Sequence, residues 1–316
     1  MTGREGSVTV GAGLPALADA LRAALGAAAV AENRPLARHT SLRVGGPADL
    51  LVTAESAGAL RQAVSLAWEQ GVPCFVLGSG SNVLVADAGI RGLVVLNKAR
   101  AAGVVEGGLR AESGAALATV ARLAVSAGLA GLEWASGIPG TVGGAVVGNA
   151  GAWGSDVAST LRQATVLQAG GDLATWPAAR FEYGYRTSVL KRQGPGRRAV
   201  VLEAEFRLRP AEEGSLRARV AEITARRRAS QPAGASCGSV FRNPPGDYAG
   251  RLVEAAGLKG ERRGGAVISP VHANFVVNEG EATAGDVRSL VELMRSEVQA
   301  RFGVSLALEI ELLGEW

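Results

Sequence analysis

The segment 137–154, with the sequence GIPGTVGGAVVGNAGAWG, constrains the fold of this chain more than any other. Seven of its eighteen residues are glycine, against an ordinary usage of about 7%. Glycine at this density permits positive φ angles and lets another molecule approach the backbone without meeting a Cβ. Apolar residues between the glycines, such as Val142 and Val146, can anchor the segment in a core. The segment therefore indicates either a backbone surface for a ligand or a tightly packed turn without one.

A second turn of small residues, 78–82 (Gly-Ser-Gly-Ser-Asn), follows an apolar strand predicted at 75–77. It lacks the third glycine and the following helix of the dinucleotide fingerprint, and it has no Gly-Lys-Ser/Thr of a Walker loop. A hydroxyl-rich turn between two strands nevertheless suits backbone contacts with a pyrophosphate. The turn at Gly45 and Gly46 could bring Arg43 to a phosphate, or it could leave that arginine solvated.

The composition narrows the class of protein. The chain has 316 residues, of which 47% are hydrophobic and 20% charged, so it can build a core and about two domains. A net charge of +4 and a pI near 9.5 favour an anionic partner, either a nucleotide or a nucleic acid. Two distant cysteines and two histidines predict no disulfide framework and no histidine-rich metal site, and indicate a reducing compartment. We find neither a signal peptide nor an apolar run that could span a bilayer.

Periodicity and turn signals predict an α+β layout. Gly170 and Gly171 indicate a hairpin, and the residues from Pro210 to Gly214 indicate a domain boundary. The arginines of the helix at 215–230 are interpreted as a solvated face, because no aromatic residues interleave with them. The predicted helices are 59–70, 115–127, 215–230, 248–256 and 284–302, with a short helix and linker in 14–31, and the predicted strands are 50–53, 75–77, 93–97, 103–106, 109–112, 163–169, 173–176, 200–208 and 306–313.

Three later motifs add charged and hydroxyl groups. They are Tyr185-Arg186-Thr187-Ser188, the run Gly238-Ser239-Val240-Phe241-Arg242-Asn243-Pro244, and Glu309-Ile310 followed by Leu313-Gly314. Together with the two glycine-rich segments they resemble the UDP-N-acetylenolpyruvoylglucosamine reductase family, from about Arg38 to Gly314. Arg242 departs from the lysine usual in the family, which keeps the charge and alters the hydrogen-bond geometry.

The resemblance implies an α+β fold with a two-part FAD-binding region of the PCMH/vanillyl-alcohol-oxidase type, followed by a smaller α+β substrate-binding domain. The expected divisions are a leader with a helix at 1–30, FAD-binding subdomains at 31–102 and 103–212, a substrate-binding domain at 213–305, and a terminal strand at 306–316. Little room separates the arginine motif from the next strand, so the chain resembles the branch of the family with a shorter loop.

The implied activity is the NADPH-driven reduction of UDP-N-acetylglucosamine enolpyruvate to UDP-N-acetylmuramate in peptidoglycan precursor synthesis. Non-covalent FAD would take hydride from NADPH and give it to the β-carbon of the enol ether. The expected partner is a nucleotide sugar, with no nucleic acid, no membrane and no metal ion, and the protein is expected to be a cytoplasmic monomer. Two alternatives are a flavin oxidase of the same architecture and a flavin-binding module without catalysis.

Three residues carry the implied chemistry. The planar fork of Arg186 matches a carboxylate, although an ion pair with Glu182 is the alternative. Ser239 would give a proton to the α-carbon, or it could be an ordinary turn serine. Glu309 needs a raised pKa to lie near a substrate carboxylate. It is preferred to Glu311 because of its spacing to Leu313-Gly314, and only one of the two is expected to face the site.

The remaining site residues are carried over from the same motifs. For His272 a core histidine with satisfied hydrogen bonds remains as open as a ligand contact. FAD is expected to contact Arg43, Gly78, Ser79, Gly80, Ser81, Asn82, Ser136, Gly137, Ile138, Pro139, Gly140, Gly143, Gly144, Asn149 and Gly151, and the substrate to contact Tyr185, Arg242, Asn243, His272 and Asn274.

Overall fold

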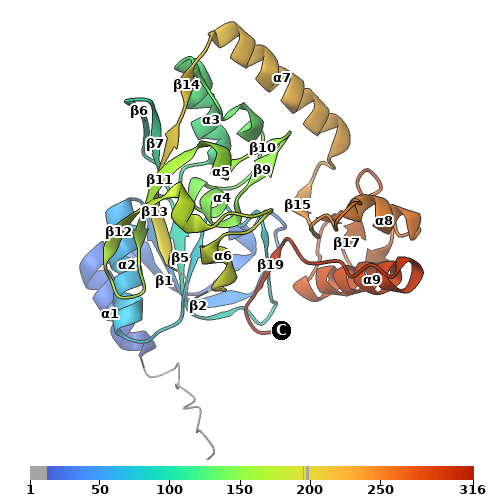
Figure 1. Cartoon of the computed structure of the whole chain (residues 1–316). Coiled ribbons are helices and arrows are strands. Elements are labelled where there is room, and N and C mark those ends of the chain that lie inside the picture. Colours follow the sequence, from blue (N-terminus) through green and yellow to red (C-terminus); the bar gives the residue numbers. More distant parts are fainter. Residues whose placement is uncertain (1–12, 195, 197–198) are drawn as a thin grey trace, which may run out of the picture.

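The computed structural model describes residues 13–194, 196 and 199–316. Two neighbouring sheets with their helices form the larger part of the molecule, and a smaller α+β body lies at its side (Figure 1). The chain enters that body through the long helix α7 (Glu213–Ser230) and leaves it to end back among the first strands. The predicted α+β architecture is therefore confirmed.

The first sheet has the strand order β1 (Val30–Pro35), β2 (Pro47–Ala54), β5 (Ile90–Asn97) and β3 (Cys74–Leu77). β2, β5 and β3 are parallel, and β1 runs antiparallel along the edge. Helices α1 (Leu14–Leu25) and α2 (Ala57–Glu69) cover one face, because alternate strand residues point to it. The edge strand β1 escaped prediction because its sequence, VAENRP, is mostly polar and exposed.

The second sheet is antiparallel, in the order β12 (Leu173–Pro177), β11 (Leu161–Leu167), β13 (Val200–Arg207), β7 (Gly108–Glu112) and β6 (Ala102–Val105). The predicted hairpin at Gly170-Gly171 is present as β11 and β12. The core packed against the second sheet contains Phe181 and Phe206, both fully buried. The helices of this part are α3 (Leu117–Ser126), α4 (Val142–Gly148), α5 (Val157–Thr160) and α6 (Val189–Arg192).

The smaller body is a four-stranded sheet with two helices against it. Its order is β15 (Ala235–Ser239), β18 (Phe275–Asn278), β17 (Ala266–Ile268) and β16 (Arg262–Arg263). The helices are α8 (Ala249–Ala255) and α9 (Ala284–Phe302), whose apolar residues form a core with this sheet. The short elements elsewhere are β4 (Val83–Val85), β8 (Leu129–Ala130), β9 (Gly151–Ala152), β10 (Ser155–Asp156) and β14 (Arg209–Pro210), with 3-10 turns at Ala27–Ala29, Leu36–His39, Glu133–Ala135 and Ala178–Phe181.

The end of the chain joins the two parts. β19 (Glu311–Leu313) pairs in parallel with β4, more than 200 residues earlier in the sequence. The prediction of a continuous strand over 306–313 is wrong. Before β19 the backbone bonds instead to the segment after β15, with Arg242 N donating to Ala307 O at 2.9 Å and Glu309 N to Val240 O at 2.8 Å. Among the described helices, none combines the length and apolar character that a membrane crossing requires.

Asp87 fastens the smaller body to the first sheet. Its two carboxylate oxygens accept the amides of Ala284 and Gly285, at 2.8 and 2.9 Å, in the first turn of the 19-residue helix α9. These amides have no partner within the helix, and the N-terminal end of a helix favours negative charge.

We expect Asp87→Ala to lower the free energy of unfolding by about 1 kcal/mol, the usual effect of losing a helix cap. Asp87→Asn should lose less, because it keeps one acceptor oxygen. Urea unfolding of the three proteins measures both values. Equal stability of Asp87→Ala and the wild type would show that this contact does not fasten α9.

Candidate active site

A cavity of about 550 Å³ lies where the two sheets and the smaller body meet. Its walls include the turn 78–82, the segment 138–153, and Arg186, Ser239 and Glu309. The structure thus gathers the two glycine-rich segments and the three residues predicted to be catalytic, which come from separate parts of the sequence.

One wall of the cavity is backbone, because glycines stand where side chains would fill the space. A Cβ on Gly148 would have no protein atom within 4 Å, and one on Gly144 would meet only Thr141 Oγ1, at 3.6 Å. Gly78 serves packing instead, since a Cβ there would lie 2.4 Å from the same hydroxyl oxygen. The glycines of α4 therefore leave a flat surface on which a large planar ligand can lie.

The turn 78–82 offers hydrogen-bond donors to the same cavity. The amides of Ser79, Gly80 and Ser81 donate to no other residue in the described part of the chain. The turn is held from behind, because Gly80 O accepts the amide of Ser41 at 3.1 Å. Successive amides exposed in a turn form a concave surface that binds anions such as a pyrophosphate.

Arg186 and Glu309 form an ion pair at the cavity. Arg186 Nε lies 2.9 Å from Glu309 Oε1, and their side chains are only 25% and 18% exposed. The Nε proton is not directed at that oxygen, so this nitrogen has no hydrogen-bond partner among the described residues. The alternative partner considered for Arg186 is wrong, because Glu182 pairs with Arg192 at 2.5 Å.

Burial raises the pKa of the Glu309 carboxyl above its ordinary value. The positive charges of Arg186, Lys191 and Arg242 oppose that shift without reversing it. Desolvation disfavours the charged form of a carboxylate, whereas nearby cations favour it. Glu309 therefore keeps its proton to a higher pH than an exposed glutamate does.

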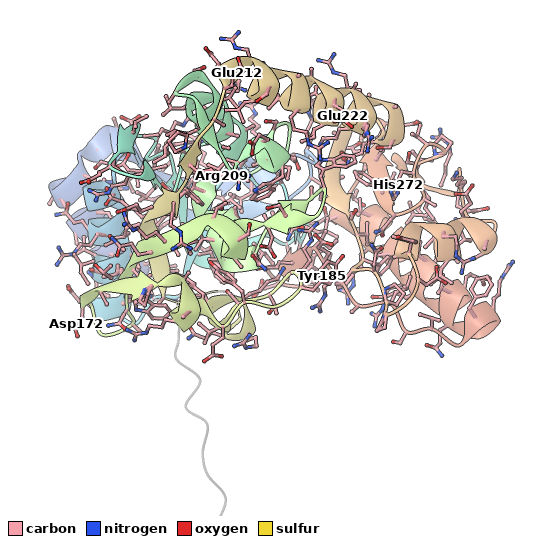
Figure 2. All side chains as sticks on the ribbon, turned by 45° about the horizontal axis from the view of Figure 1, so that its top comes forward. Asp172, Tyr185, Arg209, Glu212, Glu222 and His272 are labelled. Carbon is pink, nitrogen blue, oxygen red and sulfur yellow. The ribbon has the colours of Figure 1, made fainter. Side chains whose placement is uncertain are left out.

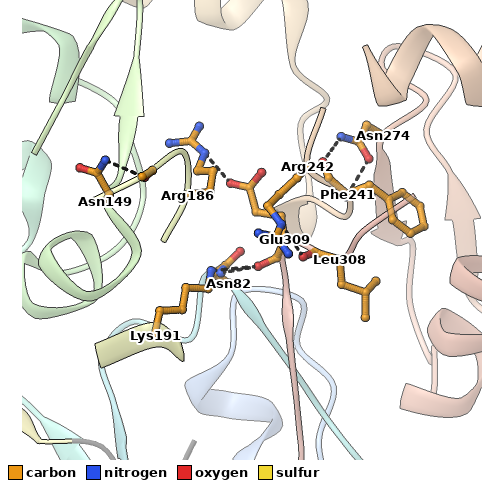
Figure 3. Close-up of polar contacts among 10 residues, drawn as sticks. Asn82, Asn149, Arg186, Lys191, Phe241, Arg242, Asn274, Leu308 and Glu309 are labelled. Carbon is orange, nitrogen blue, oxygen red and sulfur yellow. Dashed lines mark hydrogen bonds and ion pairs between the residues drawn. The ribbon is translucent and has the colours of Figure 1, made fainter. Parts of the chain in front are cut away.

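Two side chains hold the backbone carbonyl of Glu309 (Figure 3). Asn82 Nδ2 and Lys191 Nζ donate to Glu309 O at 3.1 and 3.4 Å. Both Glu309 and Glu311 line the cavity, so the expectation that only one of them could face it is wrong. Residues two apart point the same way in extended chain, which is why the two can share a wall.

Ser239 reaches the cavity through an irregularity in its strand. The register between β15 and β18 shifts between Ser236 and Ser239, and Gly238 has a φ of +76°. Such a bulge redirects the side chain that follows it, and bulges are frequent beside active sites. The Ser239 hydroxyl makes no hydrogen bond within the described residues, so it is available to a ligand.

The interpretation of the α7 arginines as a solvated face is wrong for Arg227. Arg217, Arg219 and Arg226 pair with glutamates along the exposed side of the helix, where Glu212 and Glu222 also lie (Figure 2). Arg227 is half-buried, lines the cavity and has no ion-pair partner in the described part of the chain. Burial and the neighbouring charge of Arg186 lower the pKa of Arg227. An arginine without an ion-pair partner at this wall can bind an anionic ligand.

Several predicted residues support the site from behind without lining the cavity. Asn149 ends α4 in the left-handed conformation, donates to Asp156 and to Gly184 O, and accepts from Ala158 N. This network ties the arginine turn to the glycine-rich segment. Ser136 is buried, and Gly137 lies under the side chain of Arg227.

The predicted substrate residues of the smaller body also make structural contacts. Asn274 is buried and bonds both to Phe241 N, at 3.0 Å, and to Phe241 O, at 2.8 Å (Figure 3). Asn243 Oδ1 accepts from Ala249 N at the start of α8, and Arg242 Nε donates to Leu308 O. His272 Nδ1 accepts from Asn274 N, the satisfied arrangement left open for this histidine.

Two predicted contacts lie away from the cavity. Arg43 lines a second hollow beside Ser41 and Asn278, so the structure does not bring it to the other predicted FAD contacts. Tyr185 is 58% exposed on the surface (Figure 2), where its ring lies beside the guanidinium of Arg186.

Five polar residues that line the cavity were not among the predicted site residues: Asn97, Thr141, Lys191, Arg227 and Gln231. Glu311 also lines it, although the sequence favoured Glu309. Lys191 could have been found, because it comes one helical turn after Ser188, whose hydroxyl caps α6. Arg227 carries no such signal, since it is one of three consecutive arginines and only the rotation of α7 distinguishes it.

The fold and site define a flavoprotein oxidoreductase. Residues 48–176 match a family model described as FAD binding domain. Residues 230–313 match one described as UDP-N-acetylenolpyruvoylglucosamine reductase, C-terminal domain.

Relatives extend the match over nearly the whole chain. The UDP-N-acetylenolpyruvoylglucosamine reductase of Chloroflexus aggregans is 46% identical over 89% of this chain and 96% of its own length. That of Rubrobacter xylanophilus is 47% identical over 90% and 95%. The crystal structure of the Thermus caldophilus reductase superimposes with a TM-score of 0.76 at 35% identity, covering 89% of this chain and 97% of the other. The chain belongs to the UDP-N-acetylenolpyruvoylglucosamine reductase family of FAD-dependent oxidoreductases.

The substitution Gly144→Ala tests the effect of a side chain on FAD binding separately from its effect on the stability of the fold. Alanine favours a helix over glycine by about 1 kcal/mol, so we expect the flavin-free protein to be at least as stable as the wild type. The added Cβ would lie at the cavity wall, where it would meet only Thr141 Oγ1, at 3.6 Å. We therefore expect at least about tenfold weaker FAD affinity, measured by flavin fluorescence titration.

Gly58→Ala is the matched control. Gly58 lies in α2 outside the cavity, and the nearest atom to a Cβ there is Ser56 Oγ, at 3.8 Å. It should leave FAD affinity unchanged. Unaltered affinity in Gly144→Ala as well would mean that the cofactor does not lie against α4.

Proposed function

We propose that the chain uses NADPH to reduce UDP-N-acetylglucosamine enolpyruvate to UDP-N-acetylmuramate during peptidoglycan precursor synthesis. The observation that carries the proposal is the meeting of Arg186, Ser239 and Glu309 in one cavity with a glycine wall and a turn of free amides. If Ser239 were only a turn residue and Glu309 only a solvent-facing residue, their placement in one cavity with the half-buried Arg186 would be unexplained.

The cavity fits FAD in two respects. The turn 78–82 offers amides for the pyrophosphate, and Gly144 and Gly148 leave room for a flat ring. When bound, FAD supplies two-electron chemistry, accepting hydride from NADPH and passing it to the enol ether. Among the described residues, the cavity wall contains no histidine, and its two cysteines, Cys74 and Cys237, are buried. Burial raises their pKa values to about 12. We therefore propose that FAD is held without a covalent bond.

Hydride addition to the β-carbon of the enol ether leaves negative charge on the α-carbon and, by conjugation, on the carboxylate. We assign Arg186 to that carboxylate, because its guanidinium is directed into the cavity and is only 25% exposed. A fixed cation in a dry cavity stabilises developing charge without reorganisation at the moment of reaction. The pair with Glu309 would then open or be shared as the substrate binds.

Ser239 is assigned as the proton donor to the α-carbon. Its hydroxyl has no competing partner in the described structure and lies on a bulge at the cavity wall. Serine is a weak acid, but an enolate is a strong base, and nearby cations stabilise the alkoxide that is left. Glu309, with its raised pKa, can donate a hydrogen bond to the carboxylate in the same step.

The remaining charges suit the rest of the substrate. Arg227 and Lys191 add positive charge to the cavity wall, matching a ligand with a diphosphate and a carboxylate. We retain Tyr185, on the surface beside Arg186, and Arg242, near Glu309, as proposed substrate contacts. We assign Asn243, His272 and Asn274 to positioning the segment around Arg242. We also keep the domain divisions given above, membership of the shorter-loop branch, a monomeric state and a cytoplasmic location as proposals.

Ser239→Ala should separate the two half-reactions. Bleaching of the flavin by NADPH needs nothing from this hydroxyl and should keep its wild-type rate in stopped-flow measurements. Reoxidation by the enolpyruvyl substrate should slow by about 10²- to 10⁴-fold, the usual contribution of a positioned general acid. Ser239→Cys should recover part of the loss, because a thiol can deliver a proton from a similar place.

Two results would contradict this assignment. Equal slowing of both half-reactions would indicate that the substitution disturbs the position of the flavin. An unchanged rate of reoxidation would show that another group donates the proton. Reoxidation of the wild type by dioxygen in preference to the enolpyruvyl substrate would instead support the oxidase alternative.

The raised pKa of Glu309 predicts a pH dependence. The protonated form, which can donate a hydrogen bond, exists below that pKa and is lost as the pH rises through it. The rate of reoxidation should therefore fall with rising pH above the ordinary range of a glutamate. Glu309→Gln keeps an N–H donor at every pH, so its slower reaction should lack this falling limb. The same limb in Glu309→Gln would show that another group titrates.

A further inference from the structure

Trp153 occupies a backbone conformation that tryptophan rarely adopts. It follows β9 and precedes β10, whose residues Ala152 and Ser155 are paired, so Trp153 and Gly154 form a two-residue turn. Their φ angles are +56° and +80°. A turn with two positive φ angles prefers Asn-Gly or Asp-Gly, because a bulky side chain strains the first position.

The strained residue Trp153 lines the cavity. Seven non-glycine residues among those described have a positive φ, and two of them, Arg186 and Trp153, line the cavity. Strained backbone persists where the surrounding structure maintains it, and it gathers at functional sites. Arg186 already has a proposed catalytic role, so Trp153 is the member of this pair without one.

The indole is also exposed where packing would normally cover it. Trp153 is 38% exposed, although the hairpin around it is anchored by Asn149 and Asp156. The hairpin lies near α7 and β15 (Figure 1), and Trp153 shares the cavity wall with Arg227 and Ser239 from those elements. Trp153 therefore lines the same cavity as the proposed proton donor.

We propose that the Trp153 indole packs against the ring that contains or neighbours the reacting carbon of an entering substrate. Resting on the proposed function, that ring is the nicotinamide of NADPH in the first half-reaction or the pyranose of the nucleotide sugar in the second. The nicotinamide presents a planar π face and the pyranose a face with C–H bonds, and an aromatic ring gives either one an apolar contact at little cost in side-chain entropy. In the second half-reaction the indole would bind the sugar ring while Arg186 and Ser239 act on the enolpyruvyl group attached to it.

Trp153→Asn tests the proposal, because asparagine suits the turn but removes the ring. We expect unchanged flavin content and a melting temperature equal to or above that of the wild type. Stopped-flow titrations should show at least tenfold weaker binding of NADPH, of the enolpyruvyl substrate, or of both, and the affected half-reaction identifies the ring. Trp153→Phe, which keeps an aromatic face, should bind close to the wild-type affinity.

Two control variants test separately the two properties of Trp153, its positive φ and its exposed aromatic ring. Glu281→Asn relieves a positive φ of 58° outside the cavity, and Phe302→Ala removes an aromatic ring that is 39% exposed at the end of α9. Neither should change either dissociation constant.

Three results would overturn the proposal: wild-type affinities for both substrates in Trp153→Asn, loss of its flavin, or a lowered melting temperature that Trp153→Phe restores. The proposed function fails separately, if the wild-type flavin is not bleached by NADPH or not reoxidised by the enolpyruvyl substrate.

Discussion

The parallel pairing of β19 with β4 is the contact on which the site depends. It brings the last residues of the chain back to the turn 78–82, where Asn82 holds the carbonyl of Glu309. On its other side the same tail bonds to Val240 and Arg242, directly after Ser239. One short segment therefore fixes the glutamate, the serine and the cofactor turn relative to one another. The bonds to Val240 and Arg242 are between backbone groups, so they do not depend on whether position 242 is arginine or lysine.

The electrostatics of the cavity follow from this assembly. Glu309 is buried by the closure of the tail, so its pKa rises, while Arg186 and Arg227 lose water on the same wall. Buried charges without full pairing are costly, and a ligand that carries phosphates and a carboxylate relieves the cost. The chain also keeps backbone strain at Arg186 and Trp153. These features lower the stability of the empty protein and favour binding of an anionic substrate.

Much of the fold could be predicted from periodicity. The helix predicted at 284–302 has the observed bounds of α9, because Thr283 and Asp286 form a capping box and Gly303 ends it. The two glycine-rich segments were predicted to bind a ligand, and they line one cavity. What could not be predicted depends on three-dimensional placement. The polar edge strand β1 carries no apolar alternation, the tail before β19 is extended without being a strand, and Arg227 differs from its neighbours only in the direction it faces.

We propose that reducing equivalents pass from NADPH to an enolpyruvyl ether within one cavity. Anaerobic titration of the wild-type protein tests it most directly. One equivalent of NADPH should bleach the visible absorbance of the flavin, and one equivalent of UDP-N-acetylglucosamine enolpyruvate should restore it with an equal yield of UDP-N-acetylmuramate. A bleached flavin that this substrate leaves unchanged, but that dioxygen reoxidises, would contradict the account.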